Sequence, residues 1–199
     1  NYSNFLELNL IEVLKNINIV IHLISKQHKT LSNSKKNYLK YFDINVRITE
    51  KLILAINRTN VDKIIFLSTI KVYGEYTNYN NKFSLKSKFR PETNYSKTKL
   101  LAEQIIKDKL DINKKYFIVR TPLIYGGGEK GNFSLLKRII SIGFPLPFKK
   151  INNSKSLLHI KNLCYFIELL IKKNLSKSKS LIIADETNYS TTEIIRVLI

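Results

Sequence analysis

The sequence has 199 residues, of which 44% are hydrophobic and 11% aromatic, and this is enough apolar side chain to bury the core of one domain. The net charge of +19 comes mainly from lysines that are spread over every segment, so we interpret it as a compositional bias of solvated positions and treat specific nucleic-acid binding as the minor alternative. The chain has no apolar run near the roughly 18 residues of a membrane span and opens without a secretory leader, so we expect a cytoplasmic protein without membrane contact.

The first half of the chain alternates between strand-like and helix-like periods. Residues 18–24 form a short apolar run that is typical of a strand buried on both faces of a parallel sheet. Helical spacing over 38–57 and a second buried strand at 62–68 follow. The turn residues within 69–93 predict a long loop, which leads into a helix over 94–110. Because long loops in compact domains are usually functional, this loop is the first place to look for a site.

A third buried strand at 116–120 completes a β-α-β-α-β order. This order predicts an α/β fold with an incomplete, Rossmann-like, doubly wound parallel sheet. Later elements are a loop at 121–128, helices at 132–142 and 162–173, a strand at 180–184 and a helix from about 191. The only cysteine, Cys164, lies in an apolar stretch and is predicted to be a small core residue.

The residues best suited to chemistry are Ser68 and Thr69 at the end of a strand, and Tyr95 and Lys99 at the start of a helix. The spacing of four places Tyr95 and Lys99 on one helical face. We expect the lysine ammonium to favour the phenolate and lower the pKa of Tyr95, which makes a general acid/base for the interconversion of an alcohol and a ketone. A Tyr and a Lys four apart are weak evidence alone in a chain with 11 tyrosines and many lysines. Their position, at the start of the helix that follows a strand ending in Ser-Thr, is what supports their interpretation as a catalytic pair.

Four segments in this order, at 67–75, 95–103, 119–126 and 152–159, resemble the extended short-chain dehydrogenases/reductases. They are most similar to the NAD-dependent epimerase/dehydratase branch, which acts on nucleotide-activated sugars. Residues 130–137 and 143–147 resemble UDP-N-acetylhexosamine 4-epimerases and 4-ketoreductases of surface-polysaccharide synthesis. The resemblance implies an oxidoreductase that acts at C4 of a UDP-sugar, with NAD as cofactor and NADP as the alternative, and it allows a homodimer.

The same resemblance implies roles for matching residues. Tyr95 is the expected acid/base and also contacts the cofactor, and Lys99 binds the nicotinamide ribose and tunes Tyr95. Thr69 takes the place of the family's Ser/Thr, and its hydroxyl is expected to hydrogen-bond the substrate oxygen. The cofactor-binding set also includes Ser68, together with His22 and Leu23 at the end of the first strand. In the positions just after them, Ile24 and Ser25 replace the usual pair of alanines.

The remaining assignments concern polar and charged residues elsewhere in the chain. The resemblance gives Asn132 and Lys155 contacts with the sugar-nucleotide diphosphate, although a lysine at 155 lacks the bidentate geometry of the usual arginine. Asn45 is equally well interpreted as a support of the active site or as an ordinary polar helix residue. Arg120 and Arg138 are predicted to be ordinary strand-end and surface charges. The three histidines have no metal-ligand spacing, so we expect no metal.

The glycine-rich turn that approaches a dinucleotide pyrophosphate should precede the first strand, and it is missing. We therefore expect a chain truncated at both ends, with a partial NAD(P)-binding region at 1–125 and a partial substrate-binding region at 126–199 that is interleaved with the last Rossmann elements. An inactive fragment or a non-catalytic domain with an NAD(P)-binding fold is the alternative to an enzyme.

Overall fold

The computed structural model describes residues 5, 7–27, 35–78, 81–126, 153–173 and 175–198. The chain divides into two compact units, the first made of Asn1–Arg120 and Leu170–Ile182, and the second of Thr121–Leu169 and Ile183–Ile199. The predicted boundary at residue 125 lies near this division at 120, and the return of Leu170–Ile182 to the first unit corresponds to the predicted interleaving.

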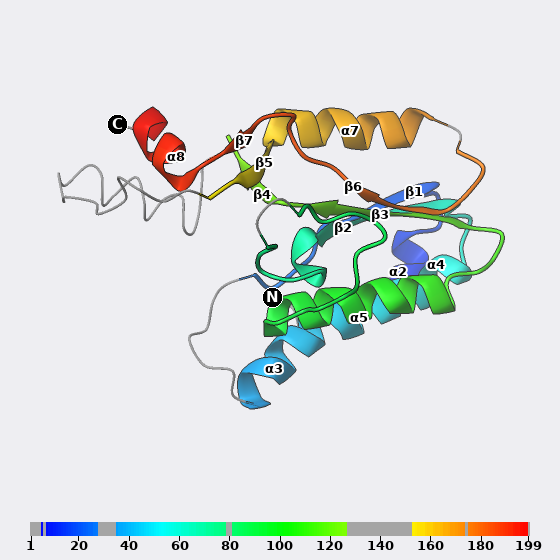
Figure 1. Cartoon of the computed structure of the whole chain (residues 1–199). Coiled ribbons are helices and arrows are strands. Elements are labelled where there is room, and N and C mark those ends of the chain that lie inside the picture. Colours follow the sequence, from blue (N-terminus) through cyan, green and yellow to red (C-terminus); the bar gives the residue numbers. More distant parts are fainter. Residues whose placement is uncertain are drawn as a thin grey trace. The chain divides into compact units, whose positions relative to one another are not determined.

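A four-stranded sheet forms the centre of the first unit (Figure 1). Its strands are β1 (Ile19–His22), β2 (Lys63–Thr69), β3 (Lys115–Thr121) and β6 (Lys179–Ile182), in the order β1-β2-β3-β6. β1 pairs with β2 and β3 pairs with β6, both in parallel. The predicted parallel α/β sheet is therefore confirmed. Parallel strands end at the same edge of a sheet, so residues that follow β1 and β2 are close to each other.

The predicted helices of the first unit are also present. The helical spacing over 38–57 corresponds to α3 (Lys35–Phe42), a π-helical segment (Asp43–Arg47) and α4 (Ile48–Asn57), which run on from one another. The long loop begins with a 3-10 turn, Ile70–Val72, and ends at α5 (Asn94–Lys109). A short helix near the start, α2 (Leu10–Val13), had not been predicted.

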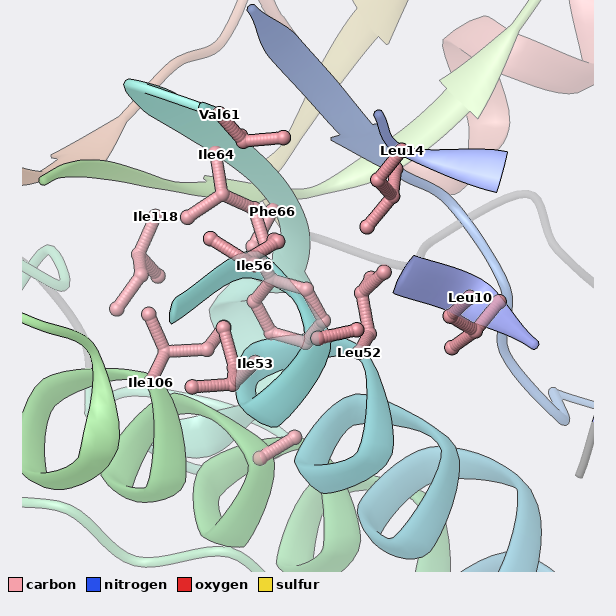
Figure 2. Close-up of a cluster of buried hydrophobic side chains, with 12 residues drawn as sticks. Leu10, Leu14, Leu52, Ile53, Ile56, Val61, Ile64, Phe66, Ile106 and Ile118 are labelled. Atoms are coloured by element: carbon pink, nitrogen blue, oxygen red, sulfur yellow. The ribbon is translucent and has the colours of Figure 1, made fainter. Parts of the chain in front are cut away.

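The core of this unit lies between the helices and the sheet. In Figure 2, Ile53 and Ile56 of α4 and Ile106 of α5 face Ile64 and Phe66 of β2. Each fully buried side chain of this size contributes about 1.5–3 kcal/mol, so the cluster fixes α5 against the sheet. The buried residues of the cluster are Leu10, Leu14, Leu52, Ile53, Ala55, Ile56, Val61, Ile64, Phe66, Ala102, Ile106 and Ile118.

The second unit contains a small sheet that the sequence analysis did not predict. β4 (Leu123–Tyr125) lies within the predicted loop at 121–128, and it pairs in parallel with β5 (Lys155–His159). β5 also pairs antiparallel with β7 (Asn188–Tyr189), and α8 (Thr191–Leu198) follows. The predicted helix at 132–142 lies outside the described residues.

Helix α7 (Ile160–Lys172) has the predicted position, but it corrects the prediction for Cys164. Leu163 and Leu170, seven residues apart, form the buried face of the helix. Cys164 is exposed, because it lies next to that face and not on it. Among the described helices, none has both the length and the apolar character that a bilayer crossing requires.

Candidate active site

Two caps fix the end of β2 and the first turn of α5. The hydroxyl of Thr69 accepts a hydrogen bond from the backbone N–H of Lys71 at 3.3 Å, which begins the 3-10 turn. At the helix, Thr93 Oγ1 accepts from the N–H of Ser96 and Ser96 Oγ accepts from the N–H of Thr93, both at 3.1 Å. A cap of this kind contributes about 1 kcal/mol. The backbones that carry Thr69 and Tyr95 are thus held in place by local bonds.

The phenol of Tyr95 lies among three polar side chains. Its oxygen accepts a hydrogen bond from Gln27 Nε2 at 3.4 Å, and the hydroxyls of Thr69 and Ser25 lie near enough to act on its pKa. Burial raises the pKa of Tyr95 above its ordinary value of 10.0, and the hydrogen bonds from Gln27, Thr69 and Ser25 oppose that rise. The structure therefore brings together Thr69 and Tyr95, which are 26 positions apart in the printed sequence.

Lys99 lies one turn further along α5 and is only 1% exposed. Its ammonium lies 3.8 Å from the centre of the Phe66 ring, and none of the hydrogen bonds and ion pairs of the described residues includes it. Burial lowers the pKa of Lys99 from 10.5 to about 7, against the opposing field of the Glu103 carboxylate. The expectation that Lys99 lowers the pKa of Tyr95 is not met. Desolvation is the largest effect on both groups: it raises the pKa of Tyr95 and lowers the pKa of Lys99, so it favours the neutral form of each.

Asn45 connects the loop after β1 with α5. It lies in the π-helical segment and is 1% exposed. Its Nδ2 donates to Thr98 Oγ1 at 2.9 Å, and its Oδ1 accepts from the N–H of Lys26 at 2.7 Å. π-Helical turns are frequent at functional sites because they re-aim one side chain of a helix. Of the two interpretations that the sequence left open, the structure favours the supporting role, since Asn45 joins the two segments that carry Gln27 and Tyr95.

The side chain of His22 points into the protein. Its Nε2 lies 2.8 Å from Thr49 Oγ1, and the Thr49 hydroxyl donates its single proton to the carbonyl of Asn45 at 2.7 Å. Nε2 must therefore carry the hydrogen. Burial, followed by the charge of Lys99, lowers the pKa of His22 to about 3, so the ring is neutral. Of the two residues predicted to meet a cofactor at this strand end, only Leu23 has an exposed side chain.

A buried ionic cluster lies behind the site. The guanidinium of Arg120 donates from Nε to Glu103 Oε1 at 3.0 Å and also bonds Glu103 Oε2, while its third nitrogen donates to the Tyr73 hydroxyl. Ser68 Oγ donates to the same carboxylate, so its hydroxyl is occupied within the protein. Glu103 is fully buried and Arg120 is 2% exposed. The prediction that Arg120 is an ordinary strand-end charge was wrong, because Glu103 neutralises it inside the core.

The two residues predicted to contact the sugar-nucleotide diphosphate, Asn132 and Lys155, are far in sequence from Thr69 and Tyr95. Asn132 lies outside the described residues. Lys155 is exposed, begins β5 of the second unit and pairs with Tyr189. Arg138 also lies outside the described residues.

Sequence reasoning missed several residues of the site. Glu103 follows Tyr95 and Lys99 at the same spacing of four, so a search along that face of the helix would have found it. Ser25 follows the first strand, at the edge where a doubly wound sheet places its ligand, so its place was indicated by the sequence. No comparable pattern pointed to Gln27, because its proximity to Tyr95 depends on the tertiary fold.

A family model described as the NAD dependent epimerase/dehydratase family matches residues 5–184. A UDP-glucose 4-epimerase of Vibrio cholerae is 32% identical over 187 residues, which are 93% of this chain and 57% of that protein. The N-acetyl-alpha-D-glucosaminyl-diphospho-ditrans,octacis-undecaprenol 4-epimerase of Escherichia coli O157:H7 is 30% identical over 136 residues, which are 66% of this chain and 40% of that protein. The chain thus spans about half the length of the curated relatives it matches.

Solved structures share the fold. The UDP-glucuronic acid 4-epimerase of Bacillus cereus, in complex with UDP-glucuronic acid and NAD, superposes with a TM-score of 0.83 at 23% identity. The match covers 98% of this chain and 62% of that one. MoeE5 in complex with UDP-glucose and NAD gives a TM-score of 0.82 at 24% identity, over 98% of this chain and 65% of that one.

Proposed function

The chain belongs to the NAD-dependent epimerase/dehydratase family, and on that premise we propose that the protein containing it interconverts an alcohol and a ketone at C4 of a UDP-sugar. The reaction is 4-epimerisation or reduction of a 4-keto sugar, in the synthesis of polysaccharide precursors. The two curated relatives named above are 4-epimerases of different glucose-type substrates, which supports C4 as the reacting position.

The observation that carries the proposal is the environment of Tyr95. Its phenol accepts a hydrogen bond from Gln27, the hydroxyl of Thr69 lies near it, and a buried ammonium lies one helical turn away. Thr69 accepts from the backbone at Lys71, so its own proton remains available to the phenol or to a sugar oxygen. In this role Tyr95 takes the proton of the C4 hydroxyl as C4 is oxidised and returns it when C4 is reduced. Thr69 orients the same oxygen.

The residues present fit NAD at one place. The Lys99 ammonium has three N–H groups, and it lies over the face of the Phe66 ring. Such donors suit the hydroxyls of a nicotinamide ribose, so Lys99 and Tyr95 would hold that ribose. When bound, NAD supplies the acceptor and donor for the C4 hydride, whereas the protein supplies orientation and proton transfer. NADP remains the alternative. We propose that the first unit binds the cofactor and that the second unit, through Lys155, contributes to substrate binding.

Replacement of Tyr95 by phenylalanine in the full-length protein tests the proposal. We expect Tyr95→Phe to lower turnover of UDP-glucose or UDP-N-acetylglucosamine by roughly 10²–10⁴-fold and to leave the Kd of the UDP-sugar unchanged, because only proton transfer is removed. Tyr76→Phe is the matched control, since Tyr76 is 73% exposed. Chromatographic detection of the 4-epimer measures epimerisation, and consumption of reduced nicotinamide measures reduction. Undiminished turnover in Tyr95→Phe rejects the assignment.

Two broader parts of the proposal need their own measurements. We propose a homodimer, which light scattering of the purified full-length protein would detect as twice the chain mass. A cytoplasmic location agrees with a supply of UDP-sugars and NAD, and fractionation of cells that express the full-length protein tests it.

A further inference from the structure

The loop after β1 also lies near the phenol of Tyr95, in addition to Thr69 at the end of β2. Gln27 Nε2 donates to the phenol oxygen at 3.4 Å, and the Ser25 hydroxyl lies near enough to the same oxygen to lower the pKa of the phenol. Gln27 and Ser25 are two residues apart. The residue between them, Lys26, has its ammonium over the Tyr41 ring at 5.6 Å and does not compete for the phenol.

The backbone of this loop is held in place by a buried side chain. Asn45 Oδ1 accepts from the N–H of Lys26 at 2.7 Å, and Asn45 Nδ2 contacts the carbonyl of the same residue at 3.4 Å. Asn45 also donates to Thr98 on α5, the helix that carries Tyr95. The positions of Ser25 and Gln27 relative to the phenol are therefore set by one amide that binds both segments.

The Ser25 hydroxyl can send its proton in two directions. It lies 3.4 Å from Asn45 Oδ1, a long contact to an acceptor that already takes the shorter bond from Lys26. Turning the proton from Asn45 to the phenol oxygen therefore leaves no buried group unsatisfied. Ser25 can accept from the neutral phenol and donate to the phenolate. Gln27 Nε2 is a donor only, so it favours the phenolate in every orientation.

We propose that Ser25 and Gln27 are positioning residues of the catalytic centre, which donate hydrogen bonds to the Tyr95 oxygen and stabilise its ionised form alongside Thr69. The inference rests on the proposed role of Tyr95 as acid/base. The family resemblance leads one to expect an alanine at residue 25. In this chain the loop instead carries two polar side chains, Ser25 and Gln27, which stabilise the phenolate. The direction agrees with the electrostatics, since these hydrogen bonds oppose the upward shift that burial gives the pKa of Tyr95.

The test is a direct titration of the phenol in the full-length protein. Tyrosine labelled with ¹³C at Cζ reports ionisation of each phenol, and the Tyr95 signal is identified by its loss in Tyr95→Phe. We expect Ser25→Ala and Gln27→Leu each to raise the pKa of Tyr95, by roughly one pH unit for a charge-assisted hydrogen bond and by less for the longer Gln27 contact. Ser25→Thr keeps a hydroxyl and should restore the wild-type value.

A second readout separates positioning from simple structural support. The acidic limb of the pH profile of kcat/KM should move upward by the same amount as the phenol titration, with about a tenfold loss of kcat/KM at pH 7 for Ser25→Ala. Ser87→Ala is the control, because Ser87 hydrogen-bonds Ser84 in the long loop and makes no bond to Tyr95. An unchanged titration and pH profile in both Ser25→Ala and Gln27→Leu overturns the inference. If Tyr95→Phe keeps full turnover, the proposed function fails instead, whatever the titrations show.

Discussion

Loss of Arg120 should destabilise the protein far more than loss of an exposed arginine. In Arg120→Met the buried carboxylate of Glu103 keeps only its bond from Ser68, and the Tyr73 hydroxyl loses the guanidinium. Removing one partner of a buried ion pair costs about 3–5 kcal/mol, because an uncompensated charge remains in the core. A domain has about 5–15 kcal/mol of stability in total, so the loss is a large fraction of it.

Urea unfolding measures this effect. The sequence contains no tryptophan and 11 tyrosines, so tyrosine fluorescence and far-UV circular dichroism are the suitable signals. A loss of about 3–5 kcal/mol lowers the Tm of a protein of this size by roughly 6–20 °C. The matched control is Arg47→Met, which breaks a 3.0 Å pair with Asp43 whose side chains are 60% and 44% exposed. An exposed pair four residues apart contributes about 0.3–0.5 kcal/mol.

The double variant Glu103→Leu with Arg120→Met completes the design. Replacing both charges removes the unpaired carboxylate, so the double variant should be more stable than Arg120→Met alone. The reasoning is refuted if Arg120→Met loses under about 1 kcal/mol and behaves like Arg47→Met, because the buried pair would then contribute no more than a solvated one.

Three further predictions concern buried or strained groups. Burial lowers the pKa of Lys99 from 10.5 to about 7, so the unfolded chain holds this proton more tightly than the folded protein. The free energy of unfolding of the wild type should therefore rise across pH 7–10.5. Lys99→Met should lose that rise, which urea unfolding at several pH values measures. Burial lowers the pKa of His22 from 6.5 to about 3, so stability should fall as pH drops through this window by up to about 1.4 kcal/mol per pH unit, and His22→Gln should remove this dependence in the same assay. Gly126 has a φ of +91°, and a Cβ there would lie 2.3 Å from His159 Nε2, so Gly126→Ala should destabilise the second unit by about 1 kcal/mol or more, measured as faster limited proteolysis.

The strands at the centre of the first unit's sheet were predictable because they are continuous apolar runs. The prediction that the first strand is buried on both faces was wrong, because in β1 only His22 is buried and Ile21 is exposed. Residues 62–68 were predicted as a strand buried on both faces, and β2 is buried at all but one of its positions. The strands of the second unit were not predictable in this way. β4 has three residues and β7 has two, which is too short for any alternation to appear.

The site was predictable where it depends on local spacing and not where it depends on tertiary contacts. Thr69, Tyr95 and Lys99 were found from a strand end and an i, i+4 pair. Arg120 was misjudged because its environment depends on Glu103, 17 residues earlier in the chain, which no periodicity connects to β3. Burial of a charge is set by its partner, so a sequence pattern that describes one strand at a time places arginine at the surface.

The helix face that carries Tyr95 also explains how Lys99 keeps its ammonium available. Tyr95, Lys99 and Glu103 follow one another at intervals of four, so their side chains lie along one side of α5. The Glu103 carboxylate raises the pKa of Lys99 against burial, yet both of its oxygens are bonded to Arg120 and it forms no ion pair with the lysine. The arginine therefore satisfies a carboxylate that would otherwise be the natural partner of Lys99. Because of this pairing, the ion pair of Glu103 with Arg120 leaves Lys99 without a carboxylate partner among the described residues.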